Sequence, residues 1–242
     1  MPRGHPDWQV NTGQFSFLDL DTAEAAVRLG SPNVYTRSGR VVYIDDFEES
    51  LSPWVVDGSG DGYAAALAAD RVMHGCRSVK LTPGSTAGMY VKIIKRFPLI
   101  RSANMGFEVL FSQLSGATSI QCGIYIVSGG ELHRYGFKGE SNTGKLTIGI
   151  PPAGTSVTVD TVDALASEDP DWRLLKIVVD PVNHLWKSLQ VDTEKWDLSA
   201  YSGVFEEGGP PDRVLVQYFG YDTTGDQSPT WLDSFILTID ET

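Results

Sequence analysis

The amino-acid sequence predicts an all-β protein: an antiparallel, two-sheet β-sandwich with a short N-terminal arm that contains one small helix. Two observations carry this prediction. From residue 41 onward, short apolar segments with a period of two are separated by turns rich in glycine and proline. No long helical segments alternate with them, so the pattern argues against a parallel sheet with crossover helices.

The first 39 residues differ from the rest, and we expect an arm over residues 1–39 followed by a sandwich domain over residues 40–242. A capping box at residues 21–24 begins a helix that Gly30 and Pro32 end after about two turns. Such a short helix is marginal by itself. We therefore expect the arm to pack on the sandwich or to join subunits of a homo-oligomer.

The remaining elements are strands of apolar and β-branched residues. Three of the turns between them, at residues 128–130, 151–154 and 181–183, are short enough to make hairpins. The expected strands cover residues 41–44, 78–81, 89–94, 106–111, 120–127, 132–137, 145–150, 155–159, 172–180, 184–191, 213–221 and 231–239.

Composition and charge argue against several classes of protein. The chain carries 31 acidic and 19 basic residues, a formal net charge of −12, so we expect no nucleic-acid partner. It has no run of about twenty apolar residues and no signal-peptide pattern at its start. We therefore expect a soluble protein without a membrane partner, with an extracellular or virion-associated location compatible with the sequence.

Two motifs suggest metal chemistry but are incomplete. Cys76 and Cys122 cannot form a metal site alone; either they form one disulfide or, as we favour, they remain reduced. Residues 57–62 match the opening of a calcium loop, but Ala68 stands where that loop needs a glutamate. A Gly-Asp turn is the favoured interpretation of this segment.

Four short patterns bear a resemblance to a known class of protein. Residues 44–48 (Ile-Asp-Asp-Phe-Glu), Trp54, residues 78–81 and residues 231–237 resemble the jelly-roll, concanavalin A-like carbohydrate-binding modules. The resemblance covers about residues 41–240. In these modules an early Asp-Phe-Glu segment and an acid of the last strand often share a structural calcium ion. The resemblance therefore implies Ca²⁺ at Asp46, Glu48 and Asp233.

Such modules bind glycans with aromatic side chains that stack on the sugar rings. The candidates in this sequence lie in polar surroundings or crowd one strand: Trp186, Trp196, Tyr218 and Tyr221. For each of them the alternative is packing in the core, which is common for aromatic residues of strands. Trp54 and Trp231 are expected to be core residues.

The closing strand connects the metal expectation to the fold. Strict alternation places Trp231, Asp233 and Phe235 on one face of this strand. If that face is the inner one, the buried acid needs a partner, and calcium is the natural candidate.

Three functions are consistent with these features. We expect a non-catalytic, lectin-like carbohydrate-binding module with a glycan ligand and no catalytic residues. The alternative is a structural or decoration protein of a virion or another large assembly. A polysaccharide lyase or glycosidase ranks third, with Tyr125, His133 and Tyr135 on adjoining strands as the residues that a lyase would use.

Overall fold

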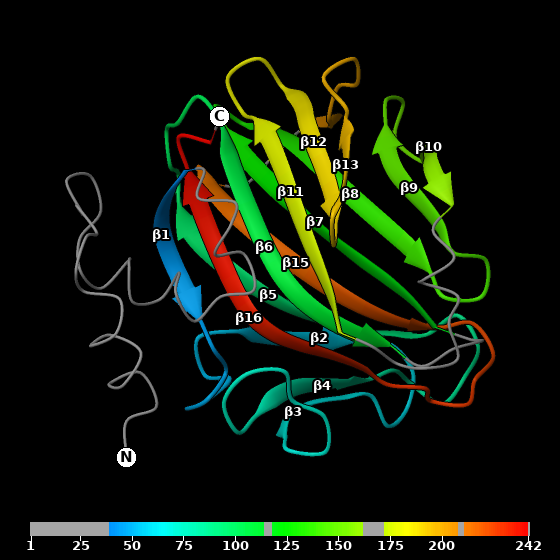
Figure 1. Cartoon of the computed structure of the whole chain (residues 1–242). Helices are drawn as coiled ribbons and strands as arrows, with labels where there is room; N and C mark the ends of the chain where they lie inside the picture. The colour runs from blue at the N-terminus through cyan, green and yellow to red at the C-terminus, as the bar shows by residue number, and fades with distance from the viewer. Residues whose placement is uncertain (1–38, 114–117, 162–171, 208–210, 242) are drawn as a thin grey trace.

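A computed structural model describes residues 39–113, 118–161, 172–207 and 211–241. These residues form two antiparallel sheets of eight strands each, which lie one in front of the other in Figure 1. The predicted all-β sandwich is therefore confirmed. The expected N-terminal helix and nearly all of the expected arm lie outside the described residues.

The first sheet, called sheet A, contains strands from both ends of the described chain. Its order is β13-β12-β11-β6-β16-β4-β3, and β1 also pairs with β16. The strands are β1 (Arg40–Asp45), β3 (Ala64–Ala68), β4 (Ser78–Thr82), β6 (Met105–Gln113), β11 (Arg173–Asp180), β12 (Leu185–Val191), β13 (Glu194–Asp197) and β16 (Thr230–Ile239).

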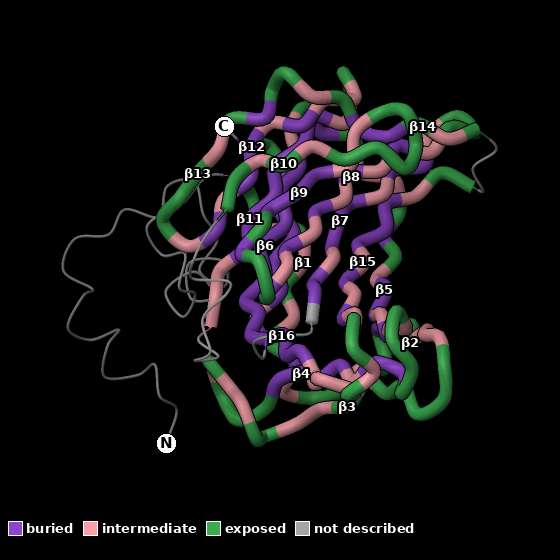
Figure 2. Tube along the Cα trace, turned by 90° about the vertical axis from the view of Figure 1, so that its right-hand side faces the viewer, coloured by how far each residue is buried: buried purple, intermediate pink, exposed green. Residues whose placement is uncertain are grey.

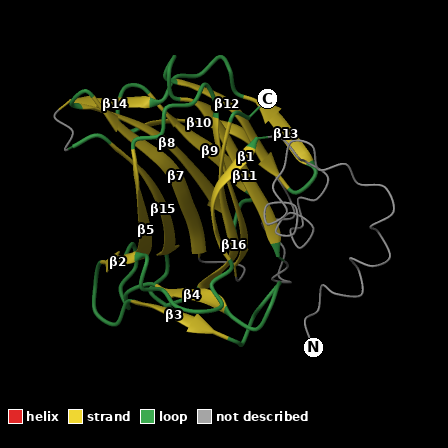
Figure 3. Ribbon diagram, turned by 90° about the vertical axis from the view of Figure 1, so that its left-hand side faces the viewer, coloured by secondary structure: helices red, strands yellow, loops and turns green. Residues whose placement is uncertain are grey.

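The second sheet, sheet B, has the order β10-β9-β8-β7-β15-β5-β2, and β14 also pairs with β8 (Figure 3). The strands are β2 (Val55–Gly58), β5 (Tyr90–Pro98), β7 (Thr118–Ser128), β8 (Glu131–Glu140), β9 (Lys145–Ile150), β10 (Thr155–Thr161), β14 (Val204–Glu207) and β15 (Arg213–Asp222).

One hydrophobic core fills the space between the sheets, and buried segments run along the central strands of both (Figure 2). Trp54 belongs to this core, and its indole Nε1 donates a hydrogen bond to Asp45 Oδ2 at 2.8 Å. Trp186 and Tyr135 meet edge to face inside the core, with ring centroids 5.8 Å apart. Apolar burial of this extent is the main driving force for the fold.

The closing strand β16 does not alternate as expected. Leu232 and Phe235 both belong to the core, because a register shift lies between Asp233 and Ile236 and Ser234 has a φ of 52°. An extra residue in one strand reverses the faces of the residues that follow it. Trp231 and Asp233 therefore lie on the outer face of sheet A, whereas Phe235 points inward, and the prediction that all three share one face is wrong.

Two other local expectations are answered by the described residues. Cys76 is exposed, Cys122 is buried, and both are free thiols. The glycine-rich segment at residues 57–62 ends strand β2 and continues into the turn that precedes β3, where Gly60 and Gly62 both have a φ of 78°. The described residues contain no helix that is long and apolar enough to cross a membrane.

Candidate functional site: a pocket on the outer face of sheet B

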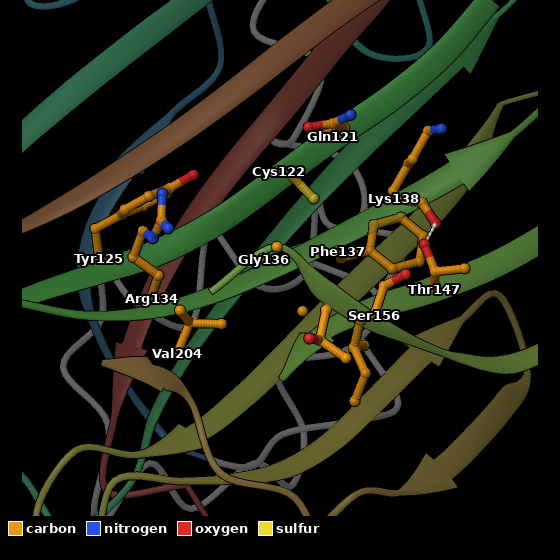
Figure 4. Close-up of a pocket in the computed structure, with 14 residues that line it drawn as sticks. Gln121, Cys122, Tyr125, Arg134, Gly136, Phe137, Lys138, Thr147, Ser156 and Val204 are labelled. Carbon is orange, nitrogen blue, oxygen red and sulfur yellow. Dashed lines mark hydrogen bonds between the residues drawn. The ribbon is translucent and has the colours of Figure 1, made fainter. Parts of the chain in front are cut away.

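A pocket of about 420 Å³ opens on the outer face of sheet B (Figure 4). Neighbouring strands β7, β8 and β9 form its floor, and the start of β10 and Val204 of β14 form its walls. Its volume falls within the range of about 300–1,000 Å³ that small-ligand sites occupy. The size and the lining both suit a small polar ligand.

Polar side chains from strands β7 to β10 surround the opening. Tyr125 and Arg134 lie together at one end of the pocket, and Gln121 and Lys138 lie toward the other (Figure 4). Burial raises the pKa of Tyr125 to about 12, so its hydroxyl keeps its proton at neutral pH. The pocket thus presents hydrogen-bond donors and acceptors at both ends.

Two glycines that face each other across β7 and β8 leave part of the floor of the pocket without side chains. Gly123 pairs with Gly136 in the register of these strands. A Cβ atom at Gly123 would come within 2.4 Å of the backbone oxygen of Tyr135, so a side chain does not fit there. At Gly136 a Cβ atom would have no heavy atom within 4 Å, so the lack of a side chain at this position leaves space in the pocket.

An aromatic cluster of Tyr90, Phe219 and Tyr221 lies on the same face. The ring centroids are 5.7 Å apart for Tyr90 and Phe219 and 5.8 Å apart for Phe219 and Tyr221, with the second pair stacked. Phe219 is the cross-strand neighbour of Gln121, which lines the pocket. The aromatic cluster and the pocket therefore form one continuous surface.

Each of three cations on this face has a carboxylate partner. Lys92 Nζ lies 2.8 Å from Asp57 Oδ2, and Lys138 Nζ lies 2.7 Å from Glu140 Oε1. Arg134 forms an ion pair with Glu206 of β14. These pairs balance the local charge, and they lower the pKa of Asp57 and of Glu140.

The four aromatic residues that the sequence predicts as ligand contacts lie in different places. Trp186 and Tyr218 are buried in the core between the sheets, with no ring surface open to a ligand. Trp196 lies on β13, where its Nε1 donates to Asp160 Oδ2 at 2.9 Å. Tyr221 alone among the four belongs to the aromatic cluster on the outer face of sheet B.

The three acids of the implied calcium site do not form a common ligand set. Asp233 Oδ2 accepts hydrogen bonds from the amides of residues 73–74, both at 2.9 Å. Glu48 Oε1 accepts from the amides of residues 76–77 at 2.6 and 3.0 Å, whereas Asp46 is exposed. Among the described residues, these three acids do not come together as a group that could hold a metal ion. Asp233 and Glu48 instead hold one loop through its backbone amides.

A different group of side chains has the composition of a metal site. Within the described residues, three side chains that could hold a metal ion come together: Glu131, His133 and His184. His133 and Tyr135 face the interior, whereas Tyr125 lies on the outer face, so the three residues that a lyase would use do not share a groove.

Sequence comparison finds no family model and no curated protein that matches the chain. Among solved structures, the cellulose-induced protein Cip1 is similar with a TM-score of 0.53 at 13% identity, over 81% of this chain and 96% of Cip1. A Bacillus subtilis protein of unknown function with a galectin-like fold has a TM-score of 0.51 at 8% identity, over 84% and 97% of the two chains. The metal-free lectin I-B4 from Griffonia simplicifolia has a TM-score of 0.50 at 9% identity, over 81% and 98%.

These identities are low, so the likeness defines the fold alone. The chain has a two-sheet β-sandwich fold similar to those of Cip1 and the lectin, and the resemblance found in the sequence is confirmed at the level of the fold. The pocket residues Gln121 and Arg134 were not predicted from the sequence, and Tyr125 was considered only as a residue of a lyase groove. The one local signal for them is Gly136, a glycine inside a strand, which marks a place where a ligand or another backbone can approach closely.

Proposed function

We propose that this protein is a non-catalytic carbohydrate-binding domain whose glycan site is the outer face of sheet B. The observation that carries the proposal is the continuity between the pocket and the aromatic cluster of Tyr90, Phe219 and Tyr221. Because one sandwich fold serves many functions, the proposal rests on this surface rather than on the fold.

The composition of the surface matches what a sugar offers. A pyranose ring has an apolar face of C–H groups, which packs on an aromatic ring, and a rim of hydroxyls that need donors and acceptors. The aromatic cluster supplies the rings. Gln121, Tyr125 and Arg134 supply the polar groups within the pocket.

The charge balance favours a neutral glycan. Lys92, Lys138 and Arg134 are each neutralised by a carboxylate on the same face. An acidic polysaccharide would have to compete with these partners, and the chain as a whole has a net charge of −12. We therefore expect neutral oligosaccharides, rather than uronates or sulfated glycans, as ligands.

Binding of the full chain to an array of neutral and acidic glycans tests the proposal. We expect neutral oligosaccharides to bind, with the affinity of Tyr221→Ala reduced about 5- to 30-fold, which corresponds to 1–2 kcal/mol. Trp196→Ala provides a comparison, because Trp196 lies on β13 of sheet A and does not line the pocket.

The outcome that contradicts the proposed site is loss of binding in Trp196→Ala with full binding in Tyr221→Ala. The melting temperature of each variant shows whether a loss comes from unfolding. Silence of the wild-type protein on the whole array would also overturn the proposal.

A further inference from the structure

A second cluster of polar side chains lies where strand β8 of sheet B meets the β11–β12 turn of sheet A. It consists of Glu131, His133 and His184. One nitrogen of each imidazole and one carboxylate oxygen of Glu131 lie within 4.8 Å of one another. None of these residues lines the pocket on the outer face of sheet B, so the cluster is a separate feature.

Backbone structure determines where all three residues lie. Glu131 and His133 are two positions apart on β8, so they point to the same face, and His133 is only 6% exposed. His184 has a φ of 59° at the end of its turn, and its carbonyl accepts a hydrogen bond from Gly203 N at 3.0 Å. Asp180 Oδ1 holds the same turn through two of its backbone amides.

The two imidazoles are stacked, with centroids 3.6 Å apart and an interplanar angle of 9°. Within the described part of the chain, the Nδ1 atoms of His133 and His184 are both buried and have no hydrogen-bond partner. Unpaired nitrogens in a buried site cost free energy unless a ligand satisfies them. The other ring nitrogen of His133, Nε2, lies 3.4 Å from Glu131 Oε2, so this imidazole and the carboxylate already face each other.

We propose that Glu131, His133 and His184 bind a divalent transition-metal ion of the zinc class, which ties the β11–β12 turn to strand β8. Two imidazoles and one carboxylate are the ligands that zinc, nickel and copper prefer, whereas calcium prefers a set made only of oxygens. Three protein ligands leave one position of a tetrahedral ion for water, and the exposed Glu131 leaves that position open to solvent. The metal site does not depend on the proposed glycan site.

Titration of the full chain with ZnCl₂ by isothermal calorimetry tests this proposal. The protein is prepared without a polyhistidine tag, treated with a chelator, and carries Cys76→Ser in every sample, because the exposed Cys76 thiol near His74 could bind zinc adventitiously. We expect one ion per chain, with an affinity reduced at least about 10- to 100-fold in Glu131→Gln and in His184→Gln. His74→Gln is the matched control and should bind as tightly as the parent.

A second readout separates loss of the site from loss of the fold. Zinc should raise the melting temperature of the parent and of His74→Gln, but not that of His184→Gln. Glu131 is exposed, so Glu131→Gln folds normally and decides the question even if a variant at the buried His133 does not fold. The proposal is overturned if the parent shows no saturable zinc binding, or if Glu131→Gln and His184→Gln both bind zinc as tightly as the parent.

Discussion

The outer faces of the two sheets both carry charged and aromatic side chains, but the partners of these side chains differ. On sheet A, Lys176 Nζ is buried and lies 2.8 Å from Glu108 Oε1 and 3.0 Å from Glu241 Oε1. On sheet B, Gln121 and Tyr125 line an open pocket. Polar groups that are satisfied within the chain hold the structure together, whereas polar groups around a hollow are available to a ligand.

This comparison predicts that substitutions on sheet A change stability and leave glycan binding of the folded protein unchanged. The largest effect is expected for Lys176→Met, because it removes the buried ammonium group that pairs with both Glu108 and Glu241. Removing one partner of a buried ion pair typically costs about 3–5 kcal/mol. Urea unfolding of the variant and the wild type measures this loss.

Arg40→Met is the control for that experiment. Arg40 pairs with Asp240 at 3.6 Å, and both side chains are more than half exposed. Exposed pairs contribute about 0–1 kcal/mol. If Lys176→Met and Arg40→Met lose equally little stability, the buried ion pairs do not have the structural role assigned to sheet A.

A smaller loss is expected for Asp233→Ala, which removes the acceptor for the amides of residues 73–74. Buried donors left without a partner cost about 1–3 kcal/mol. Chelation of calcium should leave the melting temperature of the wild type unchanged, because loop amides rather than a calcium ion occupy this carboxylate. A fall in the melting temperature on chelation would restore the calcium site at Asp46, Glu48 and Asp233.

The pH dependence of stability should differ in sign between two buried acids. Burial raises the pKa of the Asp233 carboxyl. The stability that comes from this raised pKa is therefore fully present below the ordinary pKa of an aspartate, and it is lost as the pH rises through the raised value. Burial also opposes ionisation of Asp222, but hydrogen bonds from Thr224 and Gly225 lower its pKa. Its contribution is present above the ordinary pKa and is lost as the pH falls through the lowered value.

Unfolding free energies of the wild type, Asp233→Asn and Asp222→Asn across the acidic range measure these contributions. The unfolding free energy of the wild type minus that of Asp233→Asn should fall as the pH rises. The unfolding free energy of the wild type minus that of Asp222→Asn should rise over the same range. Slopes of the same sign for the two variants would contradict the assigned environments.

The smallest effect is expected for salt. Lys92, Lys138 and Arg134 are already paired, so a neutral glycan releases no charge when it binds. Its affinity should change by less than about twofold between low and high ionic strength, because a neutral ligand has no net charge whose attraction salt could screen. A steep loss of affinity in salt would indicate an acidic ligand instead.

The strands that the sequence predicts from residue 41 onward are those with continuous or alternating apolar residues, and all of these are present. The four strands that it did not predict, β2, β3, β13 and β14, have four or five residues each. Ala64–Ala68 has no β-branched residue, and Glu194–Asp197 is mostly charged. Such segments become strands only because a neighbouring strand offers hydrogen-bond partners, and this is not visible in local sequence.

The candidate sites were harder to predict for the same reason. The bulge at Ser234 reversed the faces of β16, and strict alternation could not reveal it. Gln121 and Phe219 become neighbours only when β7 pairs with β15. His133 and His184 come from different sheets, so their stacking depends on the way in which the two sheets pack.

Filling the pocket tests the central claim most directly. A side chain at Gly136 would meet no heavy atom within 4 Å at its Cβ position, so Gly136→Leu should fill the pocket without a clash at that atom. Calorimetric titration with the tightest-binding glycan from the array should show no binding to Gly136→Leu and weakened binding to Gly136→Ala, with melting temperatures no lower than that of the wild type. Wild-type affinity in a folded Gly136→Leu would contradict the assignment of the glycan site to the outer face of sheet B.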